Sequence, residues 1–164
     1  MTVNELQSRY HSIIMTYNTS VGGTASQWGG LNTSTVTGKK PDLVFIGFGM
    51  NDGTLRVSKE KYKRNIESII SKIRQKCPDC EFVLISTMLP NEEAQGFYGE
   101  QENYLSVLNE LECEGAVVAD ITSIHKEFLT KKRYCDMTGN NVNHPNDFLS
   151  RLYAQVMIQT ICDK

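Results

Sequence analysis

Three short, uninterrupted apolar runs constrain the fold of this chain more than any other feature of its sequence. They occupy residues 43–46, 82–85 and 116–119. Runs of this length are typical of strands that are covered on both faces, as in a parallel sheet. An amphipathic helix is predicted between the first two runs, over residues 59–76, with an apolar stripe of Tyr62, Ile66, Ile69, Ile70 and Ile73. This alternation of strand and helix predicts an α/β protein with a parallel sheet.

Further elements are expected before and after this central part. An opening helix is predicted from the helical spacing of Leu6, Tyr10, Ile13 and Ile14. A short strand is expected at residues 15–17, followed by a loop rich in Gly, Ser and Thr over residues 18–38. Helices are also expected at residues 101–111, at residues 123–129 and from Asn146 onward. Doubly wound sheets usually begin with a strand, so either the chain lacks a first strand or another element takes its place.

Size and charge exclude several classes of protein. The 164 residues, of which 40% are hydrophobic, suit one domain with a single core over residues 1–164. The net charge of −2 provides no basic excess for binding nucleic acid. No run approaches the ~20 apolar residues of a membrane span. The polar N-terminus lacks a signal-peptide stretch, so a cytoplasmic location is expected unless a signal lies upstream.

The five cysteines do not indicate a redox or metal site. Their odd number argues against a disulfide framework. Cys77 and Cys80 follow a predicted helix and precede a strand, which is the reverse of the thioredoxin-like order. No second Cys/His pair lies at zinc-finger spacing, so we expect a simple turn at this pair and no metal.

Glycine and polar residues follow two of the expected strands, where ligands bind in open α/β sheets. Gly22 and Gly23 follow residues 15–17, and paired glycines allow backbone N–H groups to approach a ligand closely. Asn51 and Asp52 follow residues 43–46. A side-chain amide there can donate a hydrogen bond to a developing oxyanion. Each segment alone is also compatible with an ordinary turn.

His144 lies in a polar loop just before the last predicted helix. Pro145 follows it and suits the first turn of that helix. A histidine in such a loop can act as a general base and then as a general acid near neutral pH. His11 and His125 lack this flanking pattern and are interpreted as structural or solvent-exposed.

Together these segments resemble the second, third and fifth sequence blocks of the SGNH hydrolases, a family of GDSL-like lipases and esterases. Gly23 resembles the block-two glycine, residues 49–52 match the block-three pattern G-x-N-D, and His144 with Pro145 matches block five. The resemblance implies a three-layer α/β/α fold with a flavodoxin-like parallel sheet in the strand order 2-1-3-4-5. It also implies an ester hydrolase without a metal or organic cofactor, acting on a small or carbohydrate-linked ester such as an acetylated sugar.

The resemblance assigns roles to individual residues. It implies oxyanion donors at the Gly23 backbone and the Asn51 side chain, and a general base at His144. Asn141, three residues before His144, stands where the family usually has an aspartate that orients the histidine. Asp136, Asp147 or a backbone carbonyl could also orient it. Substrate binding is expected at Gly22, Asp52 and Trp28, although packing under the glycine loop is an equal alternative for Trp28.

The chain departs from the family at the nucleophile. The Gly-Asp-Ser segment of block one occurs nowhere in the 164 residues. In the family it ends the first strand, so we expect strand and serine to be missing together from an N-terminally truncated domain, leaving a gap in the sheet. The alternatives are a non-catalytic relative that binds an acyl or sugar ligand in the same cleft, and a flavodoxin-like binding module. The sequence leaves the oligomeric state open.

Overall fold

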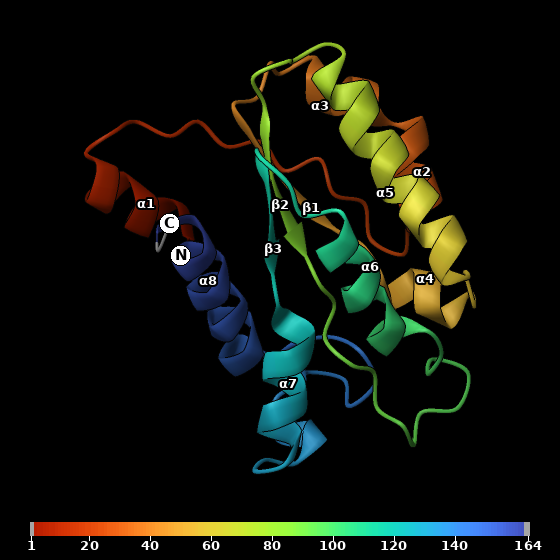
Figure 1. Cartoon of the computed structure of the whole chain (residues 1–164). Coiled ribbons are helices and arrows are strands. Elements are labelled where there is room, and N and C mark those ends of the chain that lie inside the picture. Colours follow the sequence, from red (N-terminus) through yellow and green to blue (C-terminus); the bar gives the residue numbers. More distant parts are fainter. Residues whose placement is uncertain (1, 163–164) are drawn as a thin grey trace.

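A parallel sheet of three strands lies at the centre of the molecule in the computed structural model, which describes residues 2–162 (Figure 1). The strands are β1 (Leu43–Gly47), β2 (Glu81–Ile85) and β3 (Ala116–Ala119), in the order β1-β2-β3. Leu43 lies opposite Glu81, and Phe82 lies opposite Ala116. The three apolar runs therefore form the expected strands.

Helices cover both faces of the sheet, which confirms the predicted three-layer α/β/α architecture. One layer contains α5 (Lys59–Arg74) and α6 (Tyr104–Glu110), with α2 (Ser26–Leu31) and α3 (Thr33–Thr37) packed on α5. The other layer contains α7 (Ile121–Leu129) and α8 (Asp147–Cys162), and α1 (Thr2–Tyr10) packs on α8. Three short helices complete the chain: α4 (Met50–Thr54), η1 (Gln101–Asn103) and η2 (Tyr134–Asp136). Among the described helices none has the length and apolar character needed to cross a membrane.

The core explains why these runs form strands. Phe82 and Leu84 of β2 join the apolar cluster under α5 and α6, whereas Val83 joins the cluster under α7 and α8. Successive side chains of a strand point to opposite faces, so a strand buried on both sides needs an unbroken apolar run. The helix α5 begins where the side chain of Ser58 accepts a hydrogen bond from the N–H of Lys61 at 3.3 Å, which is N-capping of the usual kind.

The strand expected at residues 15–17 does not form. The opening helix ends at Tyr10, and a coil follows in which Ile13, Met15 and Tyr17 are 89%, 73% and 55% exposed. A strand is stable only when its backbone groups find a partner. The described residues offer none at this place, so the prediction was wrong for lack of a neighbouring strand.

This coil nevertheless follows the free edge of β1. The ammonium group of Lys39, shortly before β1, lies 4.9 Å from the centroid of the Tyr17 ring. The side chain of Asn51, shortly after β1, donates a hydrogen bond to the carbonyl of Thr24 at 2.9 Å. Residues 17–24 thus pass from the beginning to the end of β1. Among the described residues no hydrogen bond joins this segment to the strand, so the sheet is open here.

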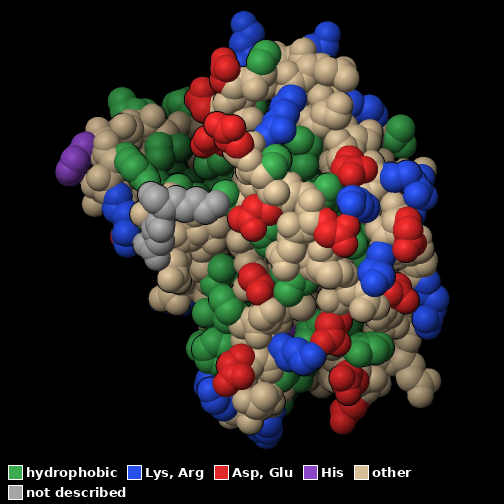
Figure 2. Space-filling model, in the orientation of Figure 1, with side chains coloured by type: hydrophobic (Ala, Val, Ile, Leu, Met, Phe, Trp, Pro, Cys, Tyr) green, Lys and Arg blue, Asp and Glu red, His purple; other side chains and the backbone are tan. Residues whose placement is uncertain are grey.

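Apolar side chains are exposed where the sheet is open. Phe45, in the middle of β1, is 41% exposed, although it belongs to a strand of the central sheet. Figure 2 shows apolar side chains gathered over α1 and the coil that follows it, whereas acidic and basic side chains are interspersed over the rest of this face. The partly exposed side chain of Phe45 lies where no described strand pairs with the outer edge of β1.

The loop expected over residues 18–38 contains two helices, α2 and α3, and α4 forms where a turn was an alternative. Local sequence did not indicate them, because glycine, serine and threonine have low helix propensity. The reason for α2 is tertiary. Its first residue, Ser26, is fully buried and bound to the carboxylate of Asp52, as described below.

Candidate active site

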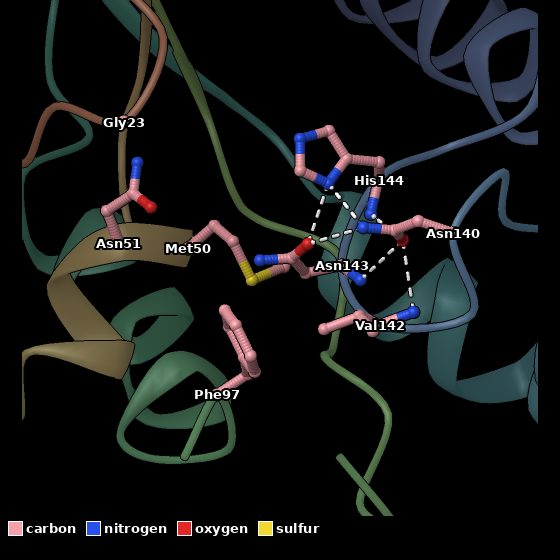
Figure 3. A pocket seen from close by; sticks show the side chains of 8 residues that line it. All are labelled: Gly23, Met50, Asn51, Phe97, Asn140, Val142, Asn143 and His144. Carbon is pink, nitrogen blue, oxygen red and sulfur yellow. Dashed lines mark hydrogen bonds between the residues drawn. The ribbon is translucent and has the colours of Figure 1, made fainter. Parts of the chain in front are cut away.

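One pocket brings together residues from three distant parts of the chain (Figure 3). It has a volume of about 480 Å³ and lies beyond the carboxyl end of β1, where α4 begins. Three of the predicted catalytic residues, Gly23, Asn51 and His144, line it. The complete lining is Gly23, Met50, Asn51, Phe97, Asn140, Val142, Asn143 and His144.

Gly23 and Asn51 lie on the same side of the pocket. The backbone of Gly23 has a φ of +78°, a conformation that favours glycine. A Cβ atom at this position would meet nothing within 4 Å, so lack of space is not the reason for glycine here. The hydrogen bond from Asn51 Nδ2 to the Thr24 carbonyl turns the amide towards this segment (Figure 3). A primary amide has two N–H groups. The second can serve a ligand oxygen together with the backbone N–H of Gly23.

Asp52 does not line the pocket, contrary to its predicted role in substrate binding. It is fully buried and accepts hydrogen bonds from the backbone N–H groups of Ser26 (3.0 Å) and Gly49 (3.2 Å). It also accepts a short hydrogen bond from the hydroxyl of Ser26, whose oxygen in turn accepts from the amide of Asn65 at 2.8 Å. The carboxylate therefore ties the segment after Gly23 to the helix that carries Asn51.

Two other residues predicted to bind substrate also lie outside the lining. Trp28 is half-buried within α2, and Gly22 is exposed in the coil. Phe97, from the loop before η1, does line the pocket. Its carbonyl accepts hydrogen bonds from the side chains of Gln101 (2.8 Å) and Thr54 (3.2 Å). The apolar wall thus comes from the loop before η1 and not from Trp28.

The imidazole of His144 is oriented by residues that the sequence analysis did not select. Its Nδ1 atom lies 2.7 Å from Oδ1 of Asn143 and 2.7 Å from Nδ2 of Asn140. Asn141 is exposed, has a φ of +54° and does not line the pocket. Asp136, an alternative, pairs with Arg133 at 2.9 Å. The run of three asparagines in residues 140–143 was the available signal, because such side chains readily bind neighbouring backbone.

A partly buried network of hydrogen bonds fixes the loop that carries His144. The hydroxyl of Tyr134 lies 2.9 Å from the carbonyl of Val142 and 3.0 Å from that of Leu89. The backbone N–H of Asn91 donates to the same Val142 carbonyl at 2.9 Å, and its side chain donates to the carbonyl of Asn141 at 2.9 Å. This network connects the pocket to the end of β2.

We expect Tyr134→Phe to lower the free energy of unfolding by about 1 kcal/mol, the usual contribution of one hydrogen bond. The loss is modest because the Val142 carbonyl keeps its bond from Asn91. Urea denaturation followed by circular dichroism measures it. Tyr98→Phe, on an exposed side chain, is the matched control. Equal stability of Tyr134→Phe and the wild type would show that the hydroxyl does not anchor the loop.

The arrangement can perform two of the three tasks of acyl transfer. Figure 3 shows the ring of His144 with one nitrogen on the asparagines and the other turned away from them. That second nitrogen can exchange a proton with a bound group. Gly23 and Asn51 can stabilise a carbonyl oxygen as it becomes negative. Among the lining residues, all of which are described, none has a hydroxyl or thiol group that could attack an ester.

Comparisons with known proteins identify the family and the fold of this chain. Residues 3–151 match the model of the GDSL-like lipase/acylhydrolase family. No curated protein sequence matches the chain with significance. A protein described as a GDSL-like lipase from Parabacteroides merdae has a similar structure, with a TM-score of 0.81 and 18% identity, over 99% of this chain and 80% of that one.

Two structures of carbohydrate-active esterases are also similar. A catalytic mutant of the acetylxylan esterase Axe2 from Geobacillus stearothermophilus has a TM-score of 0.80 and 20% identity, over 98% of this chain and 78% of that one. A carbohydrate esterase of family 3 from Talaromyces cellulolyticus has a TM-score of 0.66 and 14% identity, over 86% and 68% of the two chains. These TM-scores establish a common fold. With the family match over most of its length, the chain belongs to the GDSL-like lipase/acylhydrolase family.

Proposed function

We propose that this protein is a serine ester hydrolase that acts on a small or carbohydrate-linked ester, for example by removing acetyl groups from a sugar. The convergence of Gly23, Asn51 and His144 on one pocket supports this proposal most directly. The similarity to an acetylxylan esterase and to a carbohydrate esterase supports the class of substrate. Phe97 and Met50 add an apolar wall suited to a short acyl group.

In the proposed mechanism the nucleophilic serine comes from a segment outside the 164 residues. A parallel strand added at the open edge of β1 would bring its carboxyl end to the pocket, because the carboxyl end of β1 lies there. The serine hydroxyl transfers its proton to His144 and attacks the ester carbonyl. Gly23 and Asn51 stabilise the oxyanion, and the protonated histidine then gives its proton to the leaving alcohol. Water, activated by the same histidine, releases the acid and frees the serine.

A second candidate function is non-catalytic binding of an acyl or sugar ligand in the same pocket. One observation favours it, namely that the lining residues, all of them described, include no hydroxyl or thiol. With oxyanion donors and a histidine but without a nucleophile, the pocket would hold a carbonyl compound and leave it intact.

Two forms of the protein distinguish these functions. We expect the 164-residue chain to show no His144-dependent hydrolysis of p-nitrophenyl acetate and no labelling by a fluorophosphonate, which reacts with activated serines. The second form includes the in-frame sequence encoded upstream. If that sequence contains a strand and a serine, we expect labelling and hydrolysis, both lost in His144→Ala.

The control is His11→Ala, which removes an exposed histidine outside the pocket. Hydrolysis by the 164-residue chain that disappears in His144→Ala would contradict the proposed source of the nucleophile. An extended chain that binds acetate at the pocket without labelling or turnover would favour the non-catalytic function.

A further inference from the structure

We propose that Asn140, and not Asn141, is the positioning residue that controls where His144 carries its proton, in competition with Asn143. Asn140 contacts the imidazole directly, whereas Asn141 lies outside the pocket. The consequence of this role for catalysis rests on the proposed function. The arrangement of the side chains is independent of any reaction.

The amide of Asn140 is fixed by the backbone of its own loop. Its Oδ1 atom accepts hydrogen bonds from the N–H groups of Val142, Asn143 and His144, each at 3.0 Å. Exchanging oxygen and nitrogen would place an NH₂ group against three N–H donors, so the contacts settle the orientation of this amide. Its Nδ2 atom therefore faces both Nδ1 of His144 (2.7 Å) and Oδ1 of Asn143 (3.0 Å).

The two asparagines favour opposite tautomers of the neutral ring. An amide nitrogen can only donate, so the contact with Asn140 is favourable when Nδ1 has no hydrogen and the proton resides on Nε2. The Oδ1 atom of Asn143, also 2.7 Å from Nδ1, favours the tautomer with hydrogen on Nδ1. Only this second tautomer leaves Nε2 free to accept a proton from a nucleophile. Asn140 therefore opposes the base-competent form, and Asn143 supports it.

The residues that line the pocket offer this ring no charged partner. The carbonyl of His144 accepts the N–H of Gly139 at 2.9 Å, which fixes the backbone at the histidine. The other seven residues that line the pocket carry no titratable side chain. Asp136, the acidic residue of the same loop, is paired with Arg133. The choice between the tautomers therefore depends on Asn140 and Asn143.

Asn140→Asp tests the proposal in the full 164-residue chain. One carboxylate oxygen keeps the three backbone N–H groups, and the other replaces the amide nitrogen beside Nδ1. We expect the neutral ring to shift to the tautomer with hydrogen on Nδ1. We also expect its titration midpoint to rise by about one pH unit or more relative to the wild type, because a negative charge adjoins it. Long-range ¹H–¹⁵N spectra of the ring measure both changes without any substrate.

Asn141→Asp is the matched control, because it adds the same charge at the neighbouring position. We expect it to leave the tautomer unchanged and to raise the midpoint much less than Asn140→Asp. Asn143→Ala should shift the neutral ring towards hydrogen on Nε2. Asn143→Asp offers a second route to the same test if Asn140→Asp does not fold, because it places a carboxylate on the same nitrogen from the other side.

Equal titration shifts in Asn140→Asp and Asn141→Asp, or an unchanged tautomer in both Asn140→Asp and Asn143→Ala, would overturn the proposal. These readouts are separate from the proposed function. The tautomers could respond as described while the extended form of the protein hydrolyses no ester. That result would contradict the proposed esterase function and leave the role of Asn140 intact.

Discussion

Asp52→Ala is expected to lower the free energy of unfolding by about 3–5 kcal/mol, because it leaves three buried donors without an acceptor. These donors are the N–H and hydroxyl groups of Ser26 and the N–H of Gly49. Natural domains have a stability of only about 5–15 kcal/mol, so the variant should lie close to unfolding at room temperature. Urea denaturation, monitored by circular dichroism, gives the difference.

Asp42→Ala is the control for this prediction. It removes the same charge from an exposed position just before β1 and is expected to change stability by less than about 0.5 kcal/mol. The loss of stability in Asp52→Asn should lie between those of Asp52→Ala and Asp42→Ala, since asparagine keeps the size of the side chain and one acceptor oxygen. Equal midpoints for Asp52→Ala and Asp42→Ala would show that the carboxylate is not needed to join the Gly23 segment to α4.

Acidification is expected to remove up to about 3 kcal/mol of stability through His125 alone. Burial lowers the pKa of this histidine to about 4, well below the usual value of about 6.5. Its side chain is fully buried, and Nδ1 accepts the N–H of Leu89 at 3.0 Å, so a proton on Nδ1 would face another donor. Among the described residues no hydrogen-bond partner reaches its Nε2 atom.

The direction of the effect follows from where the proton binds. Between about pH 6.5 and pH 4 the unfolded chain binds a proton at His125, whereas the folded chain does not. Stability therefore falls as the pH falls through this window and is fully present above it. Urea denaturation at several pH values measures the wild type against His125→Gln, which cannot titrate.

Many carboxylates also titrate in this range, so the difference between the two proteins isolates the contribution of His125. His11→Gln, at an exposed position, should keep the pH dependence of the wild type. If the stabilities of wild type and His125→Gln change in parallel between pH 6.5 and pH 4, the folded protein takes up a proton at His125 as readily as the unfolded chain.

The sequence was sufficient to predict elements whose cause is local. β2 was predicted from its unbroken apolar run, and α5 was predicted from its stripe of apolar residues. The strand expected at residues 15–17 could not be judged in this way, because a strand depends on a partner elsewhere in the chain. The helix α2 escaped prediction for a similar reason, since Ser26 is held by Asp52 from the far side of β1.

The candidate site shows the same division. Gly23, Asn51 and His144 belong to short motifs after expected strands or before a helix, and the structure brings them to one pocket. The neighbours of the imidazole depend on how one loop folds on itself. Asn140 and Asn143 both reach Nδ1 of His144, and the three N–H groups on Asn140 Oδ1 fix the first of them. The family resemblance pointed instead to Asn141.

The open edge of β1 has a consequence for how this protein behaves in concentrated solution. The strand is uncharged and apolar from Leu43 to Gly47 and contains no proline or lysine of the kind that protects natural edge strands. The carbonyl of Asp42 accepts a hydrogen bond from the N–H of Glu81 in β2. Successive residues of a strand direct their backbone groups to alternate sides, so Leu43, Phe45 and Gly47 direct their N–H and C=O groups away from β2. Such an edge is a template for intermolecular sheet growth. A segment that pairs with this edge would remove the template and so act against self-association of the chain.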